Sequence, residues 1–151
     1  MAIYQSDYTI ANPVGYAGMV ANGETSNRIS RTVEDATAIP FGRAVFRGAG
    51  DHGVTQTQTG QFLGITIANY AAGAAPTGVQ ADVYPQYSTA GIMTQGVIWV
   101  VAGEDVTDGA QVYAAAAGGA LVDTSTSNVI LTGWFFQDTV ASGALVRIAK
   151  R

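Results

Sequence analysis

The stretch Gly96-Val-Ile-Trp-Val-Val101 decides the fold class, because it combines β-branched residues and an aromatic residue in a run too short for an isolated helix. Runs of the same kind recur along the chain, each bounded by Gly, Asp, Ser or Asn, at residues 41–47, 62–68, 110–114, 129–136 and 144–149. No segment has a convincing helical pattern. The sequence therefore predicts a mainly β fold, a small β-barrel or β-sandwich (tulip-like) domain.

Glycine marks the connections between these runs. The chain has 19 glycines, and many stand between predicted strands, where they supply the positive φ angles that tight turns require. Asp108-Gly109 is a turn signal that precedes a predicted strand. The Ala114 to Ala117 run has helical propensity, but Val-Tyr before it and Gly-Gly after it favour a strand end and a hairpin loop.

The first part of the chain has a different pattern. It predicts an extended N-terminal arm over residues 1–36, followed by a β-rich domain over residues 37–151, with a single domain overall. Asn12-Pro13 and Asn22-Gly23 interrupt any long regular element. The segment Ser26 to Ala36 fits either one helical turn or a strand. Aromatic and aliphatic residues are nonetheless spread along the arm, which predicts that it buries them against a partner; the candidate contact residues are Tyr4, Tyr8 and Tyr16.

Composition limits the possible functions. Only 12% of residues are charged, about half of the usual share, and such a surface is found both in proteins packed against neighbours and in plain β domains. Cysteine is absent, which excludes disulfides and thiolate metal sites. No apolar stretch approaches the length needed to span a bilayer, and residues 1–10 lack the features of a secretory signal. We expect no membrane partner and synthesis in a cytoplasm.

The charge is distributed unevenly. The formal net charge is −4, and no Lys or Arg occurs between Gly48 and Val146. An acidic body argues against nucleic-acid binding, which needs a basic face. The bases are either ordinary solubilising charge or a basic end that meets an acidic partner; the second interpretation makes Arg28, Arg31, Arg43 and Arg47 candidate contacts.

No motif predicts catalysis, a cofactor or a metal site. His52 is the only histidine, and it stands in Gly50-Asp51-His52-Gly53, which favours a turn or an interface contact. Glu104, Asp105 and Asp108 lack the ligand spacing of a Ca²⁺ loop and favour a solvated turn. Trp99, Trp134, Phe135 and Phe136 lie in apolar strands and are expected in the core, although Phe135 and Phe136 cannot face the same side of one strand.

Several stretches resemble the structural cement proteins of tailed bacteriophages. They are Asn-Gly-Glu-Thr-Ser-Asn-Arg-Ile-Ser-Arg-Thr-Val-Glu-Asp at 22–35, Phe-Gly-Arg-Ala-Val-Phe-Arg-Gly at 41–48, Asp-His-Gly at 51–53, Phe-Leu-Gly-Ile-Thr-Ile-Ala at 62–68, Tyr-Pro-Gln-Tyr at 84–87 and Met-Thr-Gln-Gly-Val-Ile-Trp-Val at 93–100. The resemblance is collinear and covers most of the chain.

This resemblance implies a protein that binds the outside of an expanded icosahedral head in the virion. There it would bridge neighbouring major capsid proteins as a homodimer or homotrimer and stabilise the shell. It implies no catalytic residues. Two other functions stay open: a carbohydrate- or host-surface-binding β-module that uses Tyr84, Tyr87 and Tyr113, and a small hydrolase that uses His52.

Overall fold

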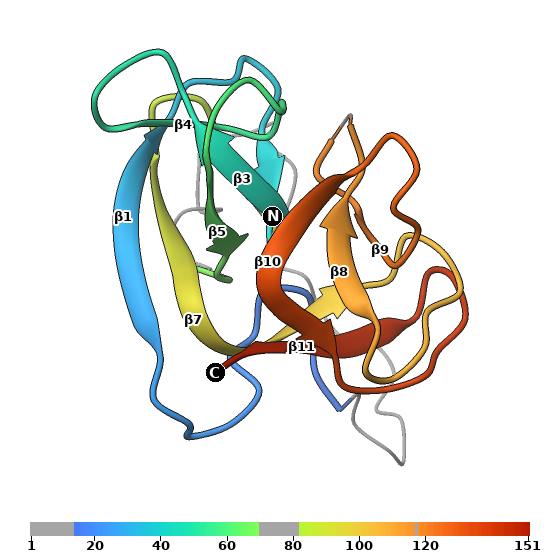
Figure 1. Ribbon diagram of the computed structural model, residues 1–151. Coiled ribbons are helices and arrows are strands. Elements are labelled where there is room, and N and C mark those ends of the chain that lie inside the picture. Colours follow the sequence, from blue (N-terminus) through green and yellow to red (C-terminus); the bar gives the residue numbers. More distant parts are fainter. Residues whose placement is uncertain (1–13, 70–81, 117) are drawn as a thin grey trace, which may run out of the picture.

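A computed structural model describes residues 14–69, 82–116 and 118–151, and these residues contain strands and no helix (Figure 1). The strands are β1 (Asn27–Val33), β2 (Ile39–Pro40), β3 (Ala44–Arg47), β4 (Gly53–Thr55), β5 (Phe62–Thr66), β6 (Val83–Tyr84), β7 (Thr89–Val101), β8 (Gln111–Ala114), β9 (Leu121–Val122), β10 (Val129–Phe136) and β11 (Leu145–Lys150). The predicted mainly β fold is confirmed.

Five strands close into a small barrel. Their order is β1-β4-β3-β5-β7, and an antiparallel pairing of β1 with β7 completes the circle. All five strands contribute to one apolar cluster, which therefore fills the barrel interior; its members include Ile29, Val33, Val45, Val54, Leu63 and Ile92. Burial alternates along β1, because successive side chains of a strand point to opposite faces.

β7 is shared by the barrel and a second sheet. Its first half pairs with β1 and β5, and its second half pairs with β11 from Gly96 to Val101. Gly96 stands at the change of partner with φ 130°, and a Cβ there would lie 2.8 Å from Ser26 Cβ. A residue without a side chain is therefore required where β7 passes from one sheet to the other. Figure 1 shows β7 leaving the barrel and passing behind β10, with β11 next to it.

The second sheet has the order β7-β11-β10-β8-β9 and curls back on itself, since Ala102 forms a parallel bridge with Leu121. A second apolar cluster fills this curl and extends to the outer face of the barrel at Phe46 and Ile65. Trp134 and Phe136 are fully buried there, whereas Phe135 is 42% exposed. The expectation that adjacent Phe135 and Phe136 face opposite sides is met.

The chain before β1 lies along the free edge of the second half of β7. Gly18 donates to the Trp99 carbonyl, Trp99 donates to Met19, and Ala21 donates to Val97. This segment thus extends the second sheet by a short strand-like piece. The packing is tight, because a Cβ at Gly15 would lie 3.0 Å from the Trp99 ring.

The structure also refines the predicted elements. The range 26–36 contains strand β1, so the helical alternative is wrong. The predicted run 41–47 is a strand only from Ala44, because Gly42 with φ 70° makes a turn first. The division into an arm (1–36) and a domain (37–151) stays a prediction. Residues 27–33, which the prediction assigned to the arm, form strand β1 of the barrel wall.

Candidate functional site

The candidate aromatic contacts of the arm are partly described. Tyr4 and Tyr8 lie outside the described residues. Tyr16 is 42% exposed and Val14 beside it is 75% exposed. The described end of the arm therefore presents apolar surface next to the point where it docks on β7.

The barrel carries the four candidate arginines on or beside two strands. Arg28 and Arg31 belong to β1, and Arg47 ends β3, which is separated from β1 by β4. Arg28 donates from Nε to Ser26 Oγ at 3.3 Å, and Arg31 donates from Nη1 to the Ser30 carbonyl at 2.9 Å. Within the described ranges, none of these three guanidinium groups forms an ion pair.

Arg43 differs from the other three. It precedes β3 at the end opposite Arg47, and burial lowers the pKa of its guanidinium. Its amide donates to Thr66 Oγ1 at 2.9 Å. The structure therefore places Arg28 and Arg31 on opposite faces of one strand, because they are three residues apart. Arg47 lies two strands away, and Arg43 lies apart from all three.

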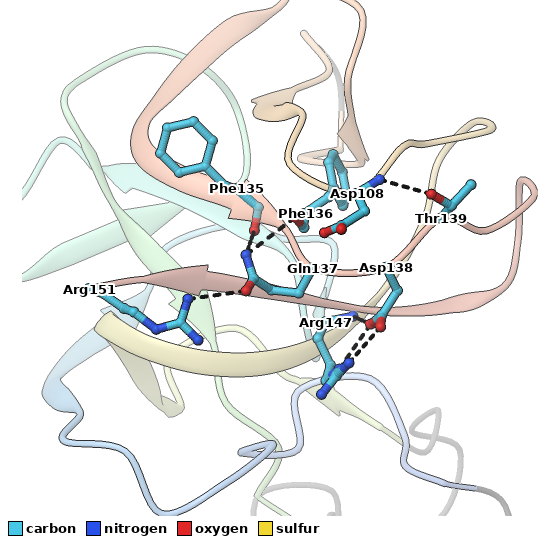
Figure 2. A network of polar contacts seen from close by, with 8 residues as sticks. All are labelled: Asp108, Phe135, Phe136, Gln137, Asp138, Thr139, Arg147 and Arg151. Atoms are coloured by element: carbon cyan, nitrogen blue, oxygen red, sulfur yellow. Dashed lines mark hydrogen bonds and ion pairs between the residues drawn. The ribbon is translucent and has the colours of Figure 1, made fainter.

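Two of the three bases at the C-terminal end, Arg147 and Arg151, form ion pairs within the chain. Arg147 holds Asp138 with two hydrogen bonds of 2.6 and 2.9 Å (Figure 2). The guanidinium of Arg147 also lies 5.6 Å from the centre of the Trp99 ring. The hydrogen bonds from Arg147 lower the pKa of Asp138, and they outweigh its burial, which raises the pKa. The charge of Arg147 is thus balanced within the domain.

Arg151 is balanced in the same way. It donates to both carboxylate oxygens of Glu24 at 2.9 and 3.0 Å, and its Nη1 donates to Gln137 Oε1 at 3.1 Å. Figure 2 shows Gln137 bridging from Arg151 to the backbone of Phe135 and Phe136. The sequence did not predict either ion pair: Glu24 and Arg151 are 127 positions apart, and Asp138 and Arg147 are 9 positions apart.

The acidic loops are structural. Glu104 accepts hydrogen bonds from the amides of Asp123 and Thr124 at 2.9 and 2.7 Å. Burial is the largest single influence on the pKa of Glu104 and raises it, but the bonds from Thr124 and Asp123 together outweigh it and lower the pKa. Asp105 accepts from the Ser142 amide. In the part of the chain that the structure describes, no three His, Cys, Asp or Glu side chains gather as metal ligands.

The aromatic residues proposed for a sugar platform do not form one. Tyr84 is fully buried, and its hydroxyl donates to the Ile67 carbonyl and accepts from the Gly91 amide, so its expected exposure is wrong. Tyr87 is 78% exposed in the β6–β7 turn with φ 64°. Tyr113 is partly buried and belongs to β8 of the second sheet. The three side chains therefore share no common surface.

His52 lies in the β3–β4 turn, where its carbonyl oxygen accepts the Thr32 amide. No hydrogen bond joins its imidazole to a serine or a carboxylate among the residues with a described position. That arrangement supports a turn residue. The described residues also include no helix that could cross a membrane.

These observations describe an all-β protein with arginines on a barrel wall and exposed apolar residues at the described end of its arm. The model of the structural cement protein family (E217 gp24/Pam3 gp6) matches residues 4–150. The chain belongs to this family of phage structural proteins, and its role is a structural one in the phage capsid.

Comparison of structures supports the fold. A chain from "The capsid of Myoviridae Phage XM1" superimposes with a TM-score of 0.71 at 17% identity, over 99% of this chain and 97% of that chain. The head fiber gp8.5 N base of bacteriophage phi29 is similar with a TM-score of 0.48 at 14% identity, over 84% of this chain and 95% of that one. No curated protein sequence matches significantly.

Proposed function

We propose that the chain binds the outer surface of the expanded icosahedral head and bridges neighbouring major capsid proteins. It acts there as a homodimer or homotrimer and stabilises the shell. Because it would bind assembled capsid better than free subunits, mass action would shift the equilibrium towards the intact head. Repeated contacts by an oligomer add avidity without enlarging any one interface.

The observation that carries this proposal is that some arginines form ion pairs within the chain and others do not. Arg147 and Arg151 are paired with acids of the same chain. Arg28, Arg31 and Arg47 have no such partner in the described residues, although the body of the domain is rich in acids. Cations left unpaired on one wall of an acidic protein suit an acidic protein surface.

The arm supports the same role. Residues 18–21 pair with β7, so the described end of the arm is anchored on the body. An arm anchored in this way can reach a neighbouring subunit and contact it through Tyr4, Tyr8 and Tyr16. Such an arm adds contact area without requiring a larger core. The proposed role requires no catalysis, nucleic acid or membrane.

Co-sedimentation with expanded capsids that lack this protein tests the proposal. We expect saturable binding of the wild-type chain, and cryo-electron microscopy of the decorated particle should place it on the outside between capsid subunits. Absence of binding at any concentration, or density on the inner surface, would contradict the proposal.

A further inference from the structure

Among the residues that the structure describes, none pairs with one edge of β1 along residues 27–31. β7 pairs with β1 from Asn27 to Thr32, but β4 on the other side pairs only with Thr32 and Val33. In Figure 1 β1 forms the outer wall of the barrel, with β4 beside its upper end only. The barrel therefore closes through the upper part of β1 and leaves the lower part of that edge without a neighbouring strand in the described chain.

The hydrogen bonds show which backbone groups face this edge. Along a strand, the N–H and C=O groups of successive residues point to opposite edges. The amide of Thr32 donates to His52 on the β4 side, and the amide of Val33 donates to Ser88 on the β7 side. The backbone groups of Arg28 and Ser30 accordingly point in the Thr32 direction, away from β7. No backbone hydrogen bond reaches them there from the described residues.

Positive side chains surround this edge. Arg31 donates to the Ser30 carbonyl, which points to the open edge, and Arg28 stands two residues before Ser30. Cations of this kind keep an open edge from pairing with an identical edge, because like charges would then lie opposite each other. The same cations favour an incoming strand that carries carboxylates.

A pocket of about 360 Å³ lies over the adjoining face of the sheet, on the β7 side of residues 28–30, and gives room for a side chain next to the edge strand. Arg28, Ile29 and Ser30 form one wall, and Ile67, Ala68 and Tyr84 are among the residues opposite. Ser30 pairs across the ladder with Gly91, which has no side chain to fill the space. The pocket thus combines a guanidinium at its rim with apolar walls.

We propose that the open edge of β1 accepts an extended, acidic segment of a capsid subunit as an added strand, with a carboxylate beside Arg28 or Arg31. This inference rests on the proposed function and assigns the contact by which it is performed. The edge groups of Arg28 and Ser30 supply the main-chain hydrogen bonds, and the arginines supply selectivity for acidic side chains. The incoming N–H takes the place of Arg31 on the Ser30 carbonyl, which frees the guanidinium for a carboxylate.

The pair Ser30→Pro and Ser30→Ala tests the proposal. Proline removes the N–H that faces the open edge but no bond within the barrel, and edge strands tolerate it. Alanine removes only the hydroxyl. In co-sedimentation with expanded capsids, we expect Ser30→Pro to bind at least about tenfold more weakly than wild type, equivalent to about 1.4 kcal/mol, and Ser30→Ala to bind as wild type does. Equal binding by folded Ser30→Pro would overturn the proposal.

Hydrogen exchange of the wild-type chain gives a second test that needs no variant. The amides of Arg28 and Ser30 should exchange fast in the free protein and become protected on capsids, whereas Val33 should be protected in both states. Unchanged exchange at 28 and 30 on bound protein would reject strand addition. Failure of the proposed function is distinguishable, because the wild-type chain would then not bind capsids at all.

Discussion

Arg151 and Glu24 form a two-pronged ion pair, with Nε–Oε2 and Nη2–Oε1 distances of 2.9 and 3.0 Å, that ties the end of the chain to the turn before β1. Glu24 also accepts a hydrogen bond from Asn22, which fixes that turn. Since residues 18–21 lie against β7 just before it, this pair helps to hold the base of the arm on the body.

Removing this tether should loosen the base of the arm and leave the fold intact. Both side chains are largely exposed, and exposed ion pairs contribute little to global stability. We expect Arg151→Ala to leave the thermal unfolding midpoint within error and to speed amide exchange at Ala21, which bonds to Val97. An unchanged exchange rate at Ala21 would show that β7 alone holds the segment.

Asp138 should make stability depend on pH. Arg147 lowers its pKa in the folded state, so its contribution is complete above the unfolded pKa of about 3.9 and is lost as pH falls through the folded value. Because the pair is partly exposed, we expect Asp138→Asn to cost about 1 kcal/mol at neutral pH. Urea unfolding of both proteins should show this difference shrinking in acid; a difference independent of pH would contradict the assignment.

Gly96 should be intolerant of a side chain. Its φ is 130°, and an added Cβ would lie 2.8 Å from Ser26 Cβ and 3.0 Å from Met93 Sδ. Strain and overpacking together predict a loss of about 2–4 kcal/mol for Gly96→Ala in chemical unfolding. Gly23→Ala is the control, since nothing lies within 4 Å of the added atom, and it should stay within about 0.5 kcal/mol of wild type.

The Tyr84 hydroxyl should be important for stability. It is buried between the Ile67 carbonyl and the Gly91 amide, so Tyr84→Phe leaves a buried acceptor without its donor. The expected cost is about 1–3 kcal/mol. Tyr113→Phe is the matched control on the second sheet and should be nearly neutral; equal losses for both variants would remove the special role of Tyr84.

Capsid binding should depend on the arm and on the barrel arginines. Residues 18–21 pair with β7, so deletion of residues 1–13 tests the arm without removing those bonds. We expect this deletion and Arg28→Glu each to lower capsid occupancy, and added salt to weaken the wild type. Lys150→Glu, with the same charge change, is the control. Full occupancy of both variants would move the contact surface elsewhere.

The sequence by itself determined the β class, the positions of most strands and the family. These features are local: alternation of apolar residues, β-branched runs and glycine turns express the preferences of neighbouring residues. The run Gly96 to Val101 already indicated a strand, and β7 contains it.

Only the tertiary structure decided which surface is available. Strand order and register bring together residues that are far apart in the sequence, and no local preference encodes that choice. The Tyr84 hydroxyl is buried because β6 directs it to the backbone at Ile67 and Gly91, although its neighbour Tyr87 is exposed. Arg147 and Arg151 form ion pairs with acids of the same chain. Arg28 and Arg31 form none with the described residues, and they lie on a strand that β4 covers only at Thr32 and Val33. A charge that is satisfied internally and one that is free for a partner look identical in sequence, because the difference is the distance to an acid brought near by folding.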